Sequence, residues 1–204
     1  ASAVVVFFAA VVQGATGFGF VIVAAPILAS YIDPKLVVPV MVVQGLVTNV
    51  ALLVATHRHV VLRRIWLMMV IGACSTPLGT FLLVRLDSAT LKVLLGLVVG
   101  IVGISMLLRF QHAFRNERLA SVPVAAASGV LTGATGLAGA PIVLFFTNQG
   151  LDQRQFRANV VAYLQMVSIA ALPSFVASNV LTGEALRLAA VLLPASGAGV
   201  LAGM

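Results

Sequence analysis

Long apolar runs separated by short charged segments dominate the chain. Seven runs are free of charge, at residues 1–32, 36–56, 65–84, 93–108, 119–151, 158–183 and 188–204. An α-helix needs about 20 apolar residues to cross the hydrocarbon core of a bilayer. The second, third and fourth runs are close to that length and predict single crossings. The sixth predicts a tilted crossing, and the seventh nearly reaches that length before the sequence stops.

The first and fifth runs, 1–32 and 119–151, are too long for a simple crossing. An unbroken helix over either run would reach roughly 48 Å, whereas the core is about 30 Å thick. Each run contains Gly-Ala-Thr-Gly near its middle, at 14–17 and 133–136, and a proline further on, Pro26 and Pro141. Glycine and proline end or bend helices, so both segments are predicted to be broken or re-entrant.

The two broken runs also indicate an internal repeat. The tetrapeptide at 14–17 recurs 119 residues later, and 32–35 recurs loosely at 151–154 with the same offset. The prolines are displaced by four residues, so the match is not uniform. We predict two homologous repeats, 1–110 and 119–204, joined by a cytoplasmic linker at 111–118. Both ends of the sequence lie within apolar runs, so we expect more protein beyond them and a truncated second repeat.

The orientation of the repeats depends on how the broken runs lie in the membrane. Kinked single crossings would give parallel repeats, whereas re-entrant hairpins would give inverted ones. Cytoplasmic loops collect Lys and Arg. The hairpin arrangement divides these residues eight to four, and the single-crossing arrangement seven to five, so inverted repeats are favoured. The eight are Arg58, Arg63, Arg64, Arg109, Arg115, Arg118, Arg154 and Arg157, and the four are Lys35, Arg85, Lys92 and Arg187.

Composition supports an all-α polytopic membrane protein. Hydrophobic residues make up 61% of the chain and charged residues 8%, with a formal charge of +7; soluble domains carry about 25% charged residues. The basic residues lie between spans, where they orient the chain in the cytoplasmic membrane, and no nucleic-acid partner is expected. Cys74 is the single cysteine. No Cys/His pattern has metal-ligand spacing, so neither a metal nor a cofactor is predicted.

An anion in the membrane would need hydrogen-bond donors. No Lys or Arg lies near the centre of a span, so the donors are the backbone N–H groups exposed at the breaks. Polar residues within spans and Arg157 add to these; Gln13, Thr48 and Ser168 also lie within spans. The candidate substrate-binding residues are Gly14, Thr16, Gly17, Gln44, Asn49, Thr132, Thr135, Gly136, Arg157 and Gln165.

Each candidate has a structural alternative. Glycines allow close helix packing, and Gln44, Asn49 and Gln165 are the types of residue that hydrogen-bond between membrane helices. Arg157 fits an interfacial arginine whose side chain reaches to the membrane surface. No Asp or Glu lies within a span, so a carboxylate proton relay is less expected than uniport or export driven by potential and gradient.

Several segments resemble the TauE/SafE family of sulfite exporters and related permeases. These are the Gly-rich segment and Pro-Ile-Leu at 14–28, the basic loop at 57–66, residues 72–79 and 91–96, and, in the second half, 136–141 and 156–159. Members often have longer glycine runs where Phe18, Phe20 and Ala138 stand here. The resemblance implies transport of a small sulfur-containing anion, either sulfite or an organosulfonate such as sulfoacetate. Membrane lipid is the other expected partner, and the sequence leaves a homodimer open.

A channel, a membrane enzyme and a scaffold subunit compete with a carrier of sulfur-containing anions. An ion, anion or water channel would also use Gly-rich re-entrant segments, and a carrier for another small organic anion fits the same pattern. A membrane enzyme is disfavoured, because no catalytic triad, His-Glu-x-x-His motif or carboxylate pair lies within the spans. A scaffold subunit would not require matching breaks in two repeats.

Overall fold

The computed structural model describes residues 2–107, 117–147 and 149–204, and every regular element in them is helical. Most of the linker expected at 111–118, with Arg109 and Arg115, lies outside the described residues. The helices are α1 (Ser2–Thr16), α2 (Phe20–Tyr31), α3 (Pro34–Thr56), the 3-10 helix η1 (His57–His59), α4 (Leu62–Arg85), α5 (Ser88–Leu107), α6 (Glu117–Thr135), α7 (Gly139–Thr147), α8 (Gln153–Ala177) and α9 (Gly183–Gly203).

Five helices are long and apolar enough to cross a membrane, namely α3, α4, α5, α8 and α9. They fall on the runs that predicted crossings. The two overlong runs are each divided into two helices, as predicted from their length and glycines. Helix α1 ends at Thr16 and α2 begins at Phe20; α6 ends at Thr135 and α7 begins at Gly139. At about 1.5 Å per residue, the 12 residues of α2 and the 9 of α7 reach only part of the way across a core of about 30 Å.

The offset of 119 residues holds for the elements as well as for the motif. The ends of α1 and α6, and the beginnings of α2 and α7, are each separated by 119 residues. Helices α3 and α8 are capped by equivalent aspartates: Asp33 accepts a hydrogen bond from Lys35 N at 2.8 Å, and Asp152 from Arg154 N at 3.3 Å. The weak match between 32–35 and 151–154 therefore marks two equivalent helix N-caps.

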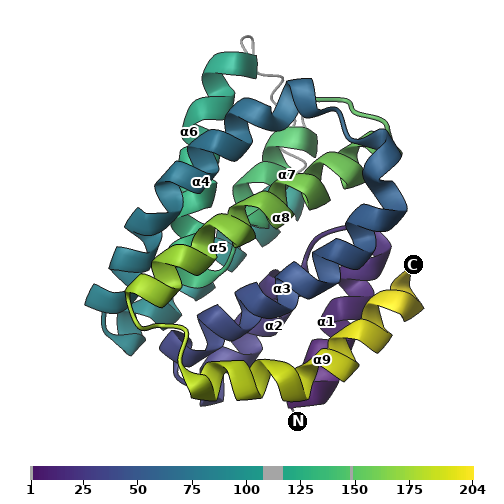
Figure 1. Cartoon of the computed structure of the whole chain (residues 1–204). Helices are drawn as coiled ribbons and strands as arrows, with labels where there is room; N and C mark the ends of the chain where they lie inside the picture. Colours follow the sequence, from purple (N-terminus) through teal and green to yellow (C-terminus); the bar gives the residue numbers. More distant parts are fainter. Residues whose placement is uncertain (1, 108–116, 148) are drawn as a thin grey trace.

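Two pairs of helices pack across the two repeats, so that each repeat exchanges its fourth helix with the other. The first helix of each repeat packs along the fourth helix of the other, α1 against α9 and α6 against α4 (Figure 1). Glycines bring the backbones together. A Cβ added at Gly14 would lie 2.9 Å from Gly203 Cα, and one added at Gly133 would lie 2.5 Å from Thr80 N. Packing through small residues is common between membrane helices, and both glycines take part in it, which is the structural alternative to a role in the site.

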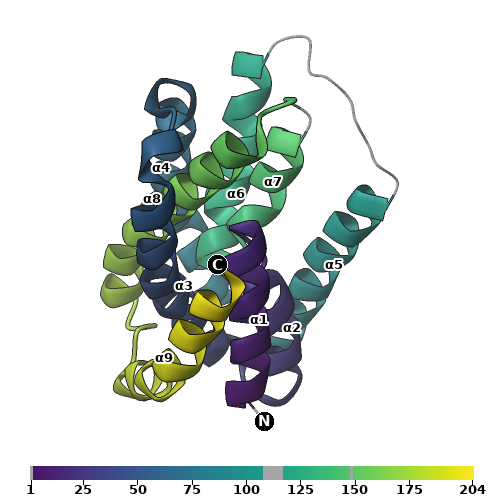
Figure 2. The same cartoon turned by 90° about the vertical axis from the view of Figure 1, so that its right-hand side faces the viewer.

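Both broken segments double back. In Figures 1 and 2, α2 lies beside α1 and α7 lies beside α6. The beginning of α1 and the α2–α3 connection lie at the lower end of the molecule in these views, whereas α6 begins at the upper end, where the α7–α8 connection also lies. The turns at 17–19 and 136–138 are therefore internal to the helix assembly, as buried irregular backbone must be in a membrane protein.

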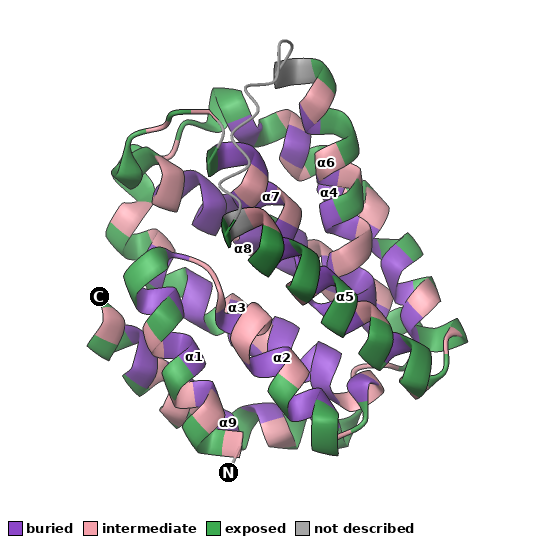
Figure 3. Cartoon of the chain, turned by 180° about the vertical axis from the view of Figure 1, so that it is seen from behind, coloured by how far each residue is buried: buried purple, intermediate pink, exposed green. Residues whose placement is uncertain are grey.

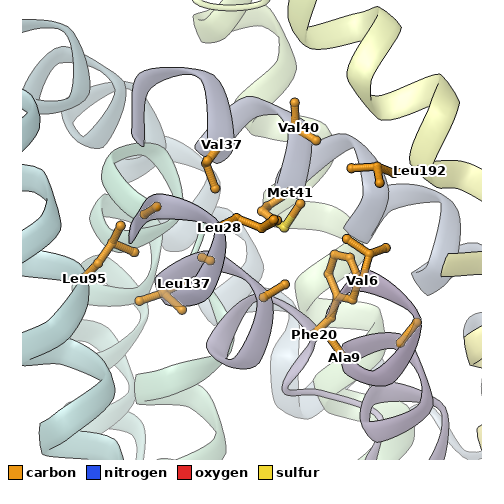
Figure 4. Packing of buried hydrophobic residues seen from close by; sticks show 14 of the residues in the cluster. Val6, Ala9, Phe20, Leu28, Val37, Val40, Met41, Leu95, Leu137 and Leu192 are labelled. Carbon is orange, nitrogen blue, oxygen red and sulfur yellow. The ribbon is translucent and has the colours of Figure 1, made fainter. Parts of the chain in front are cut away.

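The hydrophobic core consists mainly of two clusters. One joins mainly α1, α2, α3, α5 and α9, with Ala140 of α7 and Val161 of α8, and the other joins α4, α6, α7 and α8. Leu137 comes from the turn between α6 and α7, yet it packs in the first cluster beside Leu28 and Leu95 (Figure 4). Buried residues face inward and exposed residues lie on the outside (Figure 3). Many of the exposed ones are large and apolar, such as Val54 and Leu78, as a lipid-facing surface requires.

Candidate anion-binding site

The two helix breaks have the same local construction. Gly17 and Gly136 adopt φ angles of 87° and 75°, in the left-handed region that favours glycine. The threonine before each glycine donates its hydroxyl to the carbonyl four residues earlier, Thr16 to Val12 and Thr135 to Leu131, both at 2.8 Å. Each of these hydroxyls also accepts a backbone N–H two residues later. The two threonines therefore stabilise the turns that end α1 and α6.

A cavity lies between the two turns. Backbone segments 19–22 and 136–139 line it from opposite repeats, and α3 and α8 contribute the polar side chains of Asn49 and Ser168. Gln13, near the end of α1, completes the polar lining. The cavity measures about 30 Å³, and one water needs about 10–15 Å³ of such space. The cavity therefore has room for about two waters.

Asn49 and Ser168 occupy equivalent positions in the two repeats, 119 residues apart. Asn49 accepts a hydrogen bond from Gln13 Nε2 at 2.7 Å, and Gln13 Oε1 accepts one from the Thr48 hydroxyl at 3.0 Å. This chain orients the Asn49 amide. Ser168 is 6% exposed. Within the described part of the chain, neither its hydroxyl nor Asn49 Nδ2 has a partner, so both are available as donors in the cavity.

The N-termini of α2 and α7 add backbone donors. The first turn of an α-helix has N–H groups without intrahelical acceptors, and its dipole places positive potential there. Residues 20–22 begin α2 and Gly139 begins α7, and both lie on the cavity wall. Two helix N-termini, the Asn49 amide and the Ser168 hydroxyl thus line one cavity, where an anion with several acceptor oxygens would be stabilised.

Arg157 contacts the first break at the end of α1, whereas the central cavity lies at the beginning of α2. Its guanidinium donates to the carbonyl oxygen of Gly14, and its side chain covers Gly17, whose added Cβ would lie 2.6 Å from Arg157 Cγ. The Nε–H is buried without a partner in the described residues. Arg157 and Thr16 line a second cavity of about 340 Å³, which is larger than the central one. The sequence predicted both residues for the site, and the structure brings them together here.

The remaining candidates lie outside the central cavity, except Gly136, which lines it. Gln44 donates to Ala189 O at 2.9 Å and accepts from Ser196 at 2.7 Å, which ties α3 to α9. Thr132 donates to Ser128 O. Gln165 is half-buried, and its Oε1 lacks a partner in the described chain. Gly14 packs against α9.

The site predicted from the sequence omits Ser168 and Gln13, although both are polar residues within spans. The repeat offset could have identified Ser168, because it is the counterpart of the candidate Asn49. Gln13 had a weaker signal: it precedes the first break by one residue and corresponds to the candidate Thr132. Phe18 and Phe20 stand where family members often have glycine. In this chain Phe20 belongs to the first core cluster and Phe18 packs against the second, so both side chains are used in packing.

The apolar helices and the paired breaks are typical of a multi-pass membrane transporter, in which irregular backbone at membrane depth lines a cavity. The family model described as "Sulfite exporter TauE/SafE" matches residues 2–204. The chain therefore belongs to the TauE/SafE family of sulfite exporters, and the resemblance seen in its sequence is confirmed. No curated protein and no solved structure matches the chain.

Proposed function

We propose that this protein exports a small sulfur-containing anion, such as sulfite or an organosulfonate like sulfoacetate, across the cytoplasmic membrane. The observation that carries the proposal is the cavity between the two breaks, where the N-termini of α2 and α7 meet Asn49 and Ser168. A sulfur oxyanion has several acceptor oxygens and no need for acceptors from the protein. That chemistry matches a site made of N–H, amide and hydroxyl donors.

A site made of backbone dipoles and neutral donors suits a transported anion better than a site that contains a buried cationic side chain. A substrate must leave the site as well as enter it, and an arginine in the central cavity would hold a divalent anion tightly. No charged side chain is among the described residues that line the central cavity; Gln13, Asn49 and Ser168 are polar, and the rest of the lining consists of glycines and apolar residues. Attraction from two helix termini is modest, typically about 0.3–1 kcal/mol each at exposed sites and up to about 2 kcal/mol when partly buried. This range is compatible with rapid release.

The two repeats are proposed to insert in opposite orientations. The opposite positions of the two hairpins in Figures 1 and 2 support this arrangement, as does the eight-to-four division of Lys and Arg between the faces. In inverted repeats a site at the repeat interface can be exposed to either face by rocking one part against the other. The volume of about 30 Å³ holds about two waters, so the cavity must enlarge to admit a sulfite ion.

Flux in proteoliposomes tests the proposal. The purified protein should mediate sulfite uptake that saturates with concentration and that organosulfonates inhibit competitively. Liposomes without protein control for leakage. A flux that rises linearly over the whole concentration range would indicate a channel instead of a carrier. Saturable flux of organic carboxylates with no sulfite transport would replace the proposed substrate with another small organic anion.

A further inference from the structure

The larger cavity beside the first break has a strongly basic lining. We call it the vestibule; it is lined by Ala15, Thr16, Phe18, Gln153, Arg154, Phe156 and Arg157. It lies on the face of the 57–61 loop, because the beginning of α8 is tied to that loop: Val61 N donates to Asn159 Oδ1 at 2.9 Å. The same face carries Arg58, Arg63 and Arg64, the charges expected on the cytoplasmic side.

The two arginines of the vestibule have unused hydrogen-bonding capacity. Arg157 donates to the Gly14 carbonyl, while its buried Nε–H has no partner in the described chain. The side chain of Arg154 is exposed. The neighbouring carboxylate is Asp152, which accepts a hydrogen bond from Arg154 N as the cap of α8. With two guanidinium groups and one nearby carboxylate, the vestibule has a positive balance.

In the other repeat, the counterparts of Thr16, Phe18, Phe156 and Arg157 are buried and uncharged. Subtracting 119 from Phe156 and Arg157 gives Val37 and Val38, and adding 119 to Thr16 and Phe18 gives Thr135 and Leu137. These four counterparts are at most 1% exposed, whereas Thr16 is exposed. Lys35, the counterpart of Arg154, donates to Val84 O at 3.2 Å. Among the described residues, the vestibule is therefore present on one face only, although the helices around it are repeated.

We propose that the vestibule is a loading site for the oxyanion, which Arg157 and Arg154 bind from the cytoplasmic face before it reaches the central cavity. This inference rests on the proposed function and adds a direction to it, because a basic site open on one face only favours loading from that face. The planar guanidinium of Arg157 matches an oxyanion in a two-point interaction, using the nitrogen now bonded to Gly14 and the free Nε–H.

Loading is coupled to the first break through the same guanidinium. An anion that binds Arg157 competes with the Gly14 carbonyl, and so releases the bond between α8 and the end of α1. The rings of Phe18 and Phe156 lie next along the path, edge to face with centroids 6.1 Å apart. Both line the vestibule, and Gly19, the neighbour of Phe18, lines the central cavity. Phe18 therefore joins the wall of the vestibule to the wall of the central cavity through its chain neighbour Gly19.

Sulfite binding to the purified protein in dodecyl maltoside, measured by calorimetry, tests the assignment without requiring transport. Arg157→Gln is expected to weaken binding at least tenfold, and Arg157→Lys to recover part of the loss. Arg154→Gln removes an exposed side chain, so it should weaken binding severalfold in a protein that remains folded. Arg58→Gln removes a charge from the same face outside the vestibule and should bind as wild type does. Wild-type affinity in Arg154→Gln and Arg157→Gln would overturn the proposal.

A phosphate headgroup offers the same chemistry as sulfite, so the titration is repeated with phosphatidylglycerol added. Binding of the lipid at low concentration by a protein that does not bind sulfite in the absence of lipid would assign the vestibule to lipid and overturn the proposal. In a Cys74→Ala background, Thr16→Cys should react with a water-soluble thiol reagent and be protected by sulfite, while Thr135→Cys should not react. If the wild-type protein shows saturable sulfite flux but Arg154→Gln and Arg157→Gln bind sulfite as tightly as wild type does, the loading site is contradicted and the proposed function is not.

Discussion

Phe18 and Leu137 are equivalent residues, 119 positions apart, and each packs in a hydrophobic cluster built mainly by helices of the other repeat. Each follows a glycine in the left-handed conformation, at 17 and 136. Leu137 is buried in the cluster built on α1, α2, α3, α5 and α9, and Phe18 packs against the cluster built on α4, α6, α7 and α8. Each break is thereby held against helices of the other repeat, and the central cavity lies between the two breaks.

Truncation of these two residues should have unequal effects. Leu137 is 1% exposed, so Leu137→Ala is expected to reduce the free energy of unfolding by about 2–5 kcal/mol. Phe18 is partly exposed and lines the vestibule, so Phe18→Ala should cost less. Thermal unfolding in detergent measures both. A larger loss for Phe18→Ala than for Leu137→Ala would contradict the packing described.

The glycines where α1 packs on α9 and where α4 packs on α6 should lose stability when a side chain is added. At Gly133 an added Cβ would lie 2.5 Å from Thr80 N and would also meet the Thr76 carbonyl. Gly133→Ala should therefore lower stability by about 1–3 kcal/mol. Gly96 on α5 has open space around it, so Gly96→Ala is the matched control and should be neutral or stabilising by up to about 1 kcal/mol. Equal melting temperatures for the two variants would refute close packing at Gly133.

The left-handed turn at Gly136 gives a separate backbone test. Gly136→Ala forces an L side chain to φ 75°, at a cost of about 1–2 kcal/mol. Asparagine tolerates this conformation better than alanine, so Gly136→Asn should be strained less at the backbone. Gly100→Ala, on α5 with open space, is the control. If Gly136→Ala unfolds at the same temperature as wild type, the turn does not need its glycine.

Inverted repeats predict that equivalent N-cap loops face opposite sides of the membrane. In a Cys74→Ala background, Lys35→Cys and Gln153→Cys place single thiols next to the caps of α3 and α8. A membrane-impermeant reagent applied to intact cells should label Lys35→Cys, and Gln153→Cys should be labelled only after permeabilisation. Labelling of both from the same side would indicate parallel repeats.

The sequence was most informative where a local rule applied. Uncharged runs as long as 1–32 and 119–151 cannot fit one crossing, and glycine in each run located the turn closely. Contacts between distant residues could not be read in this way. The bond from Arg157 to Gly14 joins positions 143 residues apart, and the packing of Gly133 on α4 depends on the exchange of helices between repeats. Both follow from tertiary packing, which local sequence patterns do not encode.

The candidate site was partly predictable for the same reason. Asn49 and Gly136 were identified and line the cavity, whereas Gln44 bonds to α9. Both amides lie on α3, and the sequence alone does not tell which points to the cavity and which to a neighbouring helix. Ser168 lacked any local motif, and only its equivalence to Asn49 distinguishes it from other serines in spans.

The central claim is that the anion binds between the two breaks, and two serine variants test it most directly. Ser168 lines the cavity without a partner in the described chain, whereas Ser196 is buried and bonds to Gln44. Ser168→Ala should raise the KM for sulfite flux about tenfold or more, because a hydrogen bond to a charged group contributes about 1.5–3 kcal/mol, and it should leave thermal stability unchanged. Ser196→Ala should do the reverse, lowering stability by about 1–3 kcal/mol with an unchanged KM.

Sulfite flux through proteoliposomes, measured for these two variants beside wild type, is the decisive measurement. The account predicts a raised KM for Ser168→Ala alone. A wild-type KM in a folded Ser168→Ala protein, with a raised KM in Ser196→Ala, would contradict it and place the anion outside the cavity between the breaks.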